Sequence, residues 1–188
     1  MKKIAIFASG TGSNAENLAR AFADDLQICV DSLFCDRENA PVVEKMHRYG
    51  VPVFYFPKEV WRGDCKEIVE LLQDRGVDLI VLAGFTSFIA DCIVQAFDRR
   101  IINLHPSLLP KFGGKGMWGM NVHRAVIEAG EKESGITVHY VSPEIDGGEI
   151  VAQFKCEVLP DDTPETLVSR IHALEHRYLP VVVRSLLE

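Results

Sequence analysis

Short apolar segments that alternate with amphipathic stretches run through the first half of the chain. The first segment, Ile4–Ala8, is apolar throughout and is followed directly by the Gly-rich segment Ser9–Asn14. A short apolar run without alternation is typical of a strand buried on both faces, as in a parallel sheet. From Ala15 to Leu26 the apolar residues recur at helical spacing, which predicts an amphipathic helix. A strand, a glycine turn and a helix in this order favour an α/β fold.

The same alternation continues to Leu104. Further strands are expected near 29–35, 51–56, 79–83 and 101–104, and helices near 42–46, 68–72 and 88–97. Strands that alternate with helices in this way are typical of βαβ units. We therefore predict a single domain over residues 1–188, built on a doubly wound, Rossmann-like and mostly parallel sheet flanked by helices.

After Leu104 the pattern changes. Residues 105–120 are rich in Gly and Pro and have no periodicity, and a loop of that length in a compact domain is usually functional. The remaining elements are expected to be a helix over 122–129, strands over 136–141 and 150–158, and a helix that starts at Pro164. Pro180 is expected to kink or end this last helix.

Composition narrows the class of protein. The chain has 188 residues, 47% hydrophobic and 25% charged, with a formal net charge of -7. This balance is that of a globular domain, and its acidity disfavours nucleic acid and acidic membranes as partners. The five cysteines are scattered without a C-x-x-C pair, so we expect reduced thiols and no zinc site. The N-terminal apolar run is too short for a signal peptide, and we expect a cytoplasmic protein.

The segment Ser9–Asn14 is the first candidate site. A glycine turn that leads into a helix presents free backbone N–H groups, and phosphate is the expected ligand. Gly10, Gly12 and Ala15 also fit a G-x-G-x-x-A dinucleotide pattern, with Asp36 in the place of the ribose-binding acid. A third interpretation is a turn that needs glycine only for its shape.

The second candidate is the strand end at Asn103–Ser107. Asn103 and His105 project to the same side of a strand, at the sheet edge where α/β proteins bind ligands. An amide that holds a developing oxyanion beside an imidazole that moves protons suits acyl transfer. The alternative is a capping asparagine next to a surface histidine.

The third candidate is the turn Ser142–Gly148. Its Asp146 either serves the turn alone or reaches an imidazole and raises its pKa. The nearby His139 is interpreted mainly as a packed, hydrogen-bonded strand residue. His172 and His176 lie four residues apart on one helix, but no third ligand accompanies them, so no metal site is predicted.

Four motifs in this order resemble the phosphoribosylglycinamide formyltransferase family. They are G-T-G-S-N at 10–14, L-A-G-F at 82–85, N-L-H-P-S-L-L-P at 103–110 and I-D-G-G at 145–148, and the resemblance spans essentially the whole chain. It implies the formyltransferase fold and transfer of a formyl group from 10-formyltetrahydrofolate, a co-substrate, to the amine of glycinamide ribonucleotide in purine biosynthesis. It implies small-molecule substrates, no metal, and a monomer or homodimer. It further implies that the half near 1–100 binds the nucleotide phosphate, and that the half near 101–188 binds folate and carries catalysis.

The resemblance also assigns residues. The catalytic set is Asn103, His105 and Asp146, and the ribonucleotide is held by Gly12, Ser13, Asn14 and Glu175. The folate contacts are Arg62, Thr86, Ser87, Phe88, Ile89, Asn103, Val141, Glu144 and Asp146. The implied mechanism is direct acyl transfer, in which Asn103 and a protonated His105 stabilise the oxyanion and Asp146 keeps the imidazole charged.

Two departures from the family pattern bear on the site. Thr86-Ser87 stands where relatives often have Met-Arg, and the loop that contains Lys115 and Trp118 is longer than usual.

Three alternatives to this activity remain. Formyltetrahydrofolate hydrolases resemble this domain but usually add an N-terminal regulatory domain. Methionyl-tRNA formyltransferases usually need a second, basic domain. A non-catalytic dinucleotide-binding domain leaves N-L-H-P-S-L-L-P and I-D-G-G unexplained.

Overall fold

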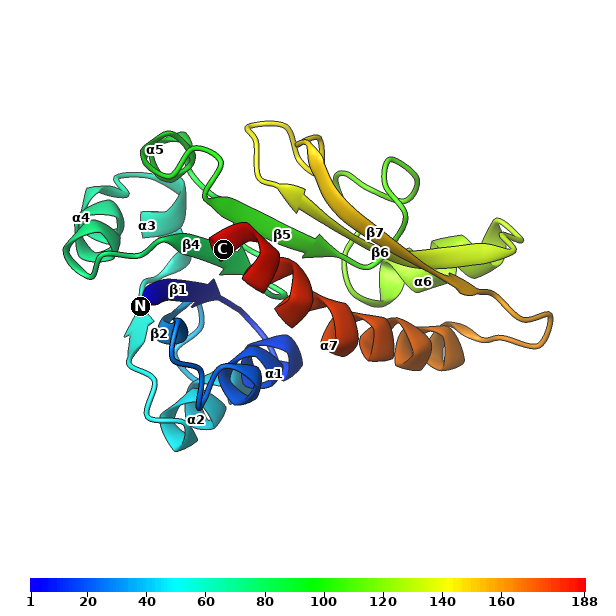
Figure 1. Ribbon diagram of the computed structural model, residues 1–188. Coiled ribbons are helices and arrows are strands. Elements are labelled where there is room, and N and C mark those ends of the chain that lie inside the picture. The colour runs from blue at the N-terminus through cyan, green and yellow to red at the C-terminus, as the bar shows by residue number, and fades with distance from the viewer. The chain divides into compact units, whose positions relative to one another are not determined.

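The computed structural model describes residues 1–188, which form two compact units (Figure 1). Unit 1 comprises Met1–Ile102 and Val183–Glu188, and unit 2 comprises Asn103–Val182. The strands are β1 Lys2–Phe7, β2 Ile28–Cys35, β3 Val53–Tyr55, β4 Leu79–Leu82, β5 Ile101–His105, β6 Glu133–Tyr140 and β7 Ile150–Glu157. The helices are α1 Ser13–Ala21, α2 Pro41–Arg48, α3 Lys58–Arg62, α4 Lys66–Asp74, α5 Asp91–Ala96, α6 Met120–Glu128 and α7 Pro164–Leu187. The seven-stranded sheet has the order β3-β2-β1-β4-β5-β6-β7.

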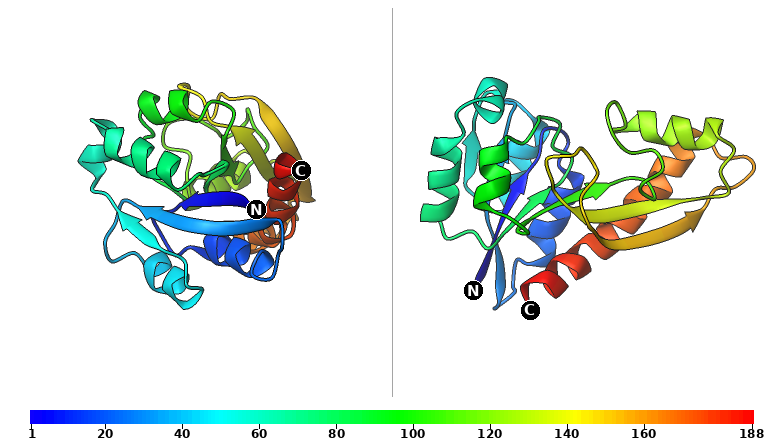
Figure 2. Two further views of the ribbon diagram at one scale, coloured as in Figure 1. Left: turned by 60° about the vertical axis from the view of Figure 1, so that its left-hand side comes forward. Right: turned by 90° about the horizontal axis from the view of Figure 1, so that it is seen from above.

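Unit 1 is built on parallel strands. β1 pairs in parallel with β2 and β4, and β2 pairs in parallel with β3. Every residue of β4 is buried, as expected for a strand covered on both faces. In unit 1, helices α1 and α2 lie on one face of these strands and α3, α4 and α5 lie on the other (Figures 1 and 2). The prediction of a doubly wound, mostly parallel sheet is confirmed.

An aromatic cluster fills one side of unit 1. Trp61 is completely buried, its ring centroid lies 5.0 Å from that of Phe7 and 4.6 Å from that of Phe85, and its indole N–H donates to the carbonyl of Phe56 at 2.9 Å. Burial of large rings in edge-to-face contact stabilises a core beyond the area that it removes from water. The cluster therefore anchors Phe85, at the start of the segment that follows β4.

Unit 2 contains an antiparallel hairpin. β6 pairs with β7 from Glu133 opposite Glu157, and β7 alternates between exposed and half-buried positions. Phe154 of β7 stacks on Tyr178 of α7 with ring centroids 3.8 Å apart, so the helix covers one face of this strand. This alternation is typical of a strand with one solvated face.

Two details of the helices differ from the sequence prediction. α7 does not end at Pro180 but continues to Leu187, although proline removes one helical hydrogen bond. Leu179, Val182 and Val183 are at most 4% exposed, and their burial offsets the cost of the proline. The short helix α3 was not predicted, because its five residues are too few to carry a periodic pattern.

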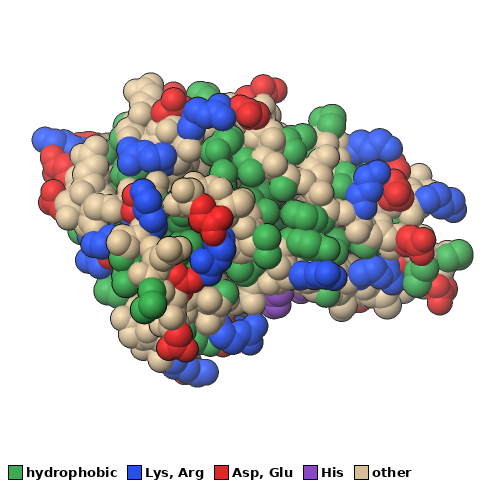
Figure 3. Space-filling view, viewed as in Figure 1, with side chains coloured by type: hydrophobic (Ala, Val, Ile, Leu, Met, Phe, Trp, Pro, Cys, Tyr) green, Lys and Arg blue, Asp and Glu red, His purple; other side chains and the backbone are tan.

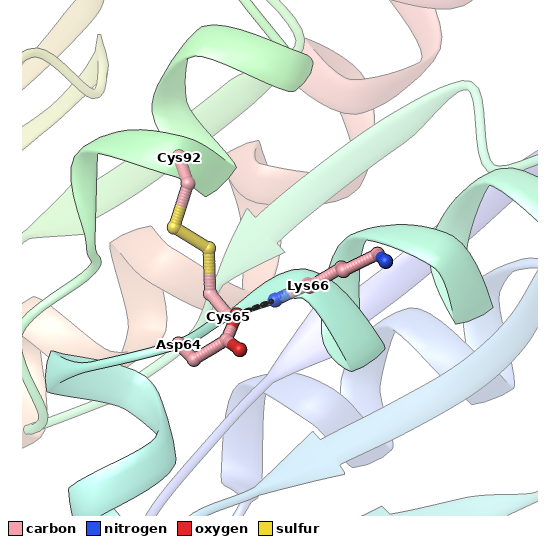
Figure 4. The surroundings of a disulfide bond; sticks show 4 residues. All are labelled: Asp64, Cys65, Lys66 and Cys92. Atoms are coloured by element: carbon pink, nitrogen blue, oxygen red, sulfur yellow. Dashed lines mark hydrogen bonds between the residues drawn. A yellow bond between two sulfur atoms is a disulfide. The ribbon is translucent and has the colours of Figure 1, made fainter.

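The expectation of five reduced cysteines is also wrong for one pair. Cys65, just before α4, and Cys92, in the first turn of α5, form a disulfide with Cα atoms 6.5 Å apart (Figure 4). The two residues are separated by 27 positions, so no local sequence motif predicts that they pair. The tertiary packing of α4 beside α5 brings them together. Cys29, Cys35 and Cys156 are free thiols.

The surface carries charges of both signs. Figure 3 shows acidic and basic side chains interspersed over the face in view, without a broad basic field. None of the helices combines the length and the apolar character that crossing a membrane requires.

Candidate active site

The candidate catalytic residues lie together in unit 2. Asn103 and His105 project from the same face of β5 because they are two residues apart on a strand. Asp146 lies in the turn between β6 and β7, and its Oδ2 is 3.6 Å from Nδ1 of His105. Its Oδ1 accepts a hydrogen bond from the Asn103 amide at 3.5 Å. The structure therefore brings these three side chains together, although Asn103 and Asp146 are 43 positions apart in the sequence.

His139 is a fourth member of this cluster. Its Nδ1 lies 2.9 Å from the carbonyl oxygen of Tyr140, which only accepts, so Nδ1 carries the proton. Nε2 is then the acceptor for the Asn103 amide at 3.1 Å and lies 3.6 Å from Oδ1 of Asp146. His139 is packed and hydrogen-bonded as predicted, but its partners are members of the catalytic set. Its position on the β6 face beside β5 is the signal that sequence reasoning did not use.

The turn around Asp146 depends on unusual backbone geometry. Asp146 has a φ of 54°, a left-handed conformation that aspartate tolerates better than most residues. The backbone N–H of Gly114 donates to Asp146 Oδ2 at 2.9 Å. At Gly148 any Cβ would overlap the carbonyl oxygen of Tyr140, so this second glycine of I-D-G-G is required by close approach.

Opposing effects act on the two ionisable partners. Burial lowers the pKa of His105; Asp146 and the carbonyl of Phe112 act in the opposite direction, and the net pKa lies below its usual value. Burial alone would raise the pKa of Asp146, but the neighbouring imidazole of His139, the hydrogen bond from the Gly114 N–H and the imidazole of His105 hold it below its usual value. The resting His105 is therefore neutral at neutral pH. This shift opposes the protonated histidine that the resemblance implies, because desolvation exceeds the effect of Asp146.

The same geometry fixes the tautomer of His105. Its Nε2 lies 2.8 Å from the carbonyl oxygen of Phe112, so Nε2 carries the proton and donates it. Nδ1 then presents a lone pair toward Asp146. Protonation at Nδ1 would create an imidazolium beside a carboxylate, which favours that charge state. The pair can thus accept a proton transiently at Nδ1.

A hydroxyl buried beneath the site holds the loop that follows β5. Thr137 Oγ1 donates to the carbonyl of Ser107 at 2.6 Å and accepts from the backbone N–H of Leu109 at 3.0 Å. Gln153 Nε2 donates to Thr137 Oγ1 at 2.9 Å, and Thr137 itself is fully buried. These contacts position the chain that leads to Phe112, the hydrogen-bond partner of His105.

The predicted phosphate loop lies in unit 1, at the start of α1. Gly12 is the residue before the helix, with a φ of 70°, and it has no side chain that could cap the first turn. A Cβ at Gly12 would overlap the side chain of Val42 in α2, so glycine is required both for the conformation and for the close packing. The start of α1 follows this glycine directly, and the positive end of the helix dipole there favours an anion. Asn14 is 9% exposed, and Ser13 is half-buried.

The other predicted contact residues differ in accessibility. Glu175 of α7 is 6% exposed, whereas Arg62 at the end of α3 is exposed. In unit 1, Thr86 and Phe88 are exposed and Ile89 is buried. In unit 2, Val141 is half-buried and Glu144 is exposed.

Two observations bear on the alternatives. Asp36, the ribose-binding acid of the dinucleotide interpretation, is 4% exposed, and its Oδ2 accepts a hydrogen bond from Ser87 at 2.5 Å. Its carboxylate is therefore not presented to a ribose. No group of three or more His, Cys, Asp or Glu side chains is arranged to hold a metal ion.

Comparison with known proteins decides the family. The profile of the family described as "Formyl transferase" matches residues 2–183. The chain belongs to the formyl transferase family. It is 40% identical over 191 residues to the phosphoribosylglycinamide formyltransferase of Bacillus subtilis (strain 168), covering all of this chain and 95% of the relative. It is 41% identical over 192 residues to the chloroplastic enzyme of that name from Arabidopsis thaliana, of which it spans 66%.

Solved structures of formyl transferases agree with the fold. The phosphoribosylglycinamide formyltransferase of Bacillus halodurans superposes with a TM-score of 0.89 at 36% identity, covering 100% of this chain and 96% of the other. Glycinamide ribonucleotide transformylase 1 of Geobacillus kaustophilus gives a TM-score of 0.89 at 36% identity, with both chains covered completely. The predicted formyltransferase fold is confirmed.

Proposed function

We propose that this formyl transferase moves the formyl group of 10-formyltetrahydrofolate to the amine of glycinamide ribonucleotide. The observation that carries the proposal is the cluster of Asn103, His105 and Asp146, in which Nδ1 of the imidazole lies 3.6 Å from the carboxylate. Full-length similarity to relatives named for this reaction supports the choice of substrates. The step belongs to purine biosynthesis.

Folate, when bound, supplies the formyl carbon and a nitrogen leaving group. Nδ1 of His105 accepts the proton that the attacking amine releases. Asp146 stabilises the imidazolium that results, and Asn103 donates a hydrogen bond to the formyl oxygen as negative charge develops on it. His105 then returns its proton to the leaving nitrogen, so that protons balance. His139 holds the Asn103 amide in place for this role.

The Asn103 amide must exchange a partner during this cycle. Its contact with Asp146 Oδ1 is 3.5 Å long, at the limit of a hydrogen bond, whereas its contact with His139 is 3.1 Å. The weaker contact is the one that a substrate oxygen replaces. Asn103 therefore remains oriented by His139 while one N–H turns to the substrate.

We assign the phosphate of the ribonucleotide to the start of α1. Gly12 precedes this helix, and Ser13 and Asn14 belong to its first turn, where the helix dipole favours an anion. This local device suits a chain with a net charge of -7. Glu175 is proposed to hold the ribonucleotide from α7, and as it is 6% exposed, it contacts substrate only through a small part of its surface.

The proposed folate contacts supply both apolar and polar groups. Phe88 of unit 1 is 47% exposed, so its apolar side chain is available to a pteridine or benzoyl ring. The further proposed folate contacts are Arg62, Thr86, Ser87, Ile89, Val141 and Glu144. The donors Arg62 and Thr86 suit a ligand that carries carboxylates.

The remaining expectations stay proposals. We place the protein in the cytoplasm, as a monomer or homodimer that binds neither nucleic acid nor membrane. We also propose that residues near 1–100 bind the nucleotide phosphate and residues near 101–188 carry folate binding and catalysis. Lys115 and Trp118 are candidates for substrate contacts from their loop.

The decisive assay follows product formation with both substrates and with each one omitted. Formylated glycinamide ribonucleotide should form only when folate donor and amine are both present. Formate release at an equal rate without the amine would instead identify a hydrolase. Thermal stabilisation by NAD alone, with no response to either proposed substrate, would favour the dinucleotide-binding alternative.

A further inference from the structure

The segment that follows β4 is fastened to the ends of two other strands in unit 1. β1 pairs with both β2 and β4 in parallel, so the carboxyl ends of the three strands lie at one edge. Ser9 and Asp36 come just after β1 and β2, and Ser87 lies in the segment that follows the end of β4 at Leu82. Three polar side chains from three strand ends thus meet at the edge where α/β proteins bind their ligands.

Specific hydrogen bonds join them. The backbone N–H of Thr86 donates to Ser9 Oγ at 2.9 Å, and Ser9 N–H donates to the carbonyl of Gly84 at 3.1 Å. Ser87 Oγ donates to Asp36 Oδ2 at 2.5 Å, so the link from β2 to the β4 segment passes over the end of β1. Phe85, between these anchors, packs against Trp61. The backbone from Gly84 to Ser87 is therefore held on both of its sides.

The burial of Asp36 lowers the stability of the fold, which a purely structural role does not explain. It is 4% exposed, and its Oδ1 is buried without a hydrogen-bond partner. A buried carboxylate oxygen that loses water and gains no donor costs stability. The single strong contact of this carboxylate is the Ser87 hydroxyl. The cost of burying Asp36 is accounted for if its hydrogen bond to Ser87 has the role of positioning that residue.

We propose that Asp36 is a positioning residue, which acts through Ser87 to fix the folate-binding segment Thr86–Ile89. Ser87 directs its hydroxyl inward to Asp36 and serves this segment as an anchor, while the exposed Thr86 and Phe88 face the ligand. Preorganisation of a binding segment improves affinity by reducing the entropy lost on binding. The inference rests on the proposed function, because the assignment of this segment to folate comes from it.

The test measures steady-state kinetics and folate-analogue binding for Ser87→Ala, Asp36→Ala and the double variant. Each single change should raise the KM for folate and the analogue Kd about tenfold, the factor expected for one hydrogen bond to a charged group. The double variant should resemble the singles, since either change breaks the same link. The rise in the KM for folate should exceed any change in kcat or in the KM for the amine, because the link acts on the folate-binding segment.

Rescue and control variants separate positioning from general damage. Asp36→Asn and Ser87→Thr each keep the Ser87–Asp36 hydrogen bond and should restore most of the folate affinity. Ser32→Ala removes a fully buried hydroxyl from β2, outside the network, and should leave folate affinity unchanged. If Asp36→Ala fails to fold, Ser87→Ala and its threonine rescue still decide the question, because Ser87 is only half-buried.

Two results would overturn this inference and leave the proposed function intact. The first is an active wild-type enzyme whose Ser87→Ala variant has an unchanged KM for folate. The second is a double variant in which the effects of Ser87→Ala and Asp36→Ala add. A wild-type chain that neither binds a folate analogue nor transfers formyl groups would instead overturn the proposed function, and this inference with it.

Discussion

The two units use their strands in different ways. In unit 1 the strand β4 is apolar and buried along its whole length, and the ligand contacts that we propose lie in the loops beyond the strand ends. In unit 2 the strands themselves carry polar residues, with Asn103 and His105 on β5 and Thr137 and His139 on β6. A binding site made of backbone N–H groups needs only a glycine turn and a helix. A proton-transfer site needs side chains in register, which a strand with a polar stripe supplies.

The largest expected effect tests the side-chain site. His105→Ala should reduce kcat by about 10³, because general acid–base catalysis by one group contributes on this scale. His172→Ala, which removes an exposed histidine of the same unit, is the matched control and should leave kcat unchanged. Kinetics are compared after circular dichroism has shown both variants folded. A folded His105→Ala enzyme with near wild-type kcat would show that the side chains on the strands of unit 2 do not form the proton-transfer site.

Asp146→Asn should also reduce kcat, by about 10², and it should change the pH profile in a defined direction. Asp146 favours the charged imidazole, so its neutralisation lowers the pKa of His105 further. The acidic limb of kcat/KM should therefore move to lower pH. A limb that moves to higher pH, or does not move, would mean that another group controls it.

The next effect tests the backbone site. Gly12→Ala forces a left-handed φ on alanine and an overlap with Val42, and should lower the free energy of unfolding by about 4 kcal/mol. Gly10→Ala meets no atom within 4 Å and should cost less than about 1 kcal/mol. Urea denaturation compares the two. Equal losses would show that the loop needs glycine for flexibility rather than for this packing.

The smallest effect concerns buried imidazoles, which only unit 2 contains. His123 of α6 is 2% exposed, and its burial lowers the pKa from 6.5 to about 4. The unfolded chain therefore binds the proton first, and the stability contribution, complete above pH 6.5, is lost as the pH falls toward 4. Between pH 6.5 and pH 5 the loss should be about 2 kcal/mol.

His123→Gln should flatten this part of the stability curve, which denaturation at a series of pH values measures. The carboxylates whose pKa values are lowered, such as Asp25, contribute at lower pH and do not obscure it. An unchanged slope would assign the acid sensitivity to other groups.

Several local features were predictable because they depend on neighbours in sequence. The apolar runs specify buried strands, since only a parallel sheet covered on both faces suits them. The glycine at position 12 and the helix that follows define, by local geometry alone, the turn to which we assign the phosphate. Asn103 and His105 share a face because a strand has a period of two.

Other features were decided only by tertiary packing, because they depend on desolvation and on contacts between distant segments. Burial overrides Asp146 and leaves His105 neutral, and the approach of β6 to β5 makes His139 the partner of Asn103. The packing of α4 beside α5 brings Cys65 and Cys92 together in a disulfide. The burial of apolar side chains stabilises α7 beyond Pro180, so the helix continues to Leu187. The sequence determined which chemical groups stand at the strand ends. Folding decided their protonation and their partners, since both depend on water removed by residues far away in the chain.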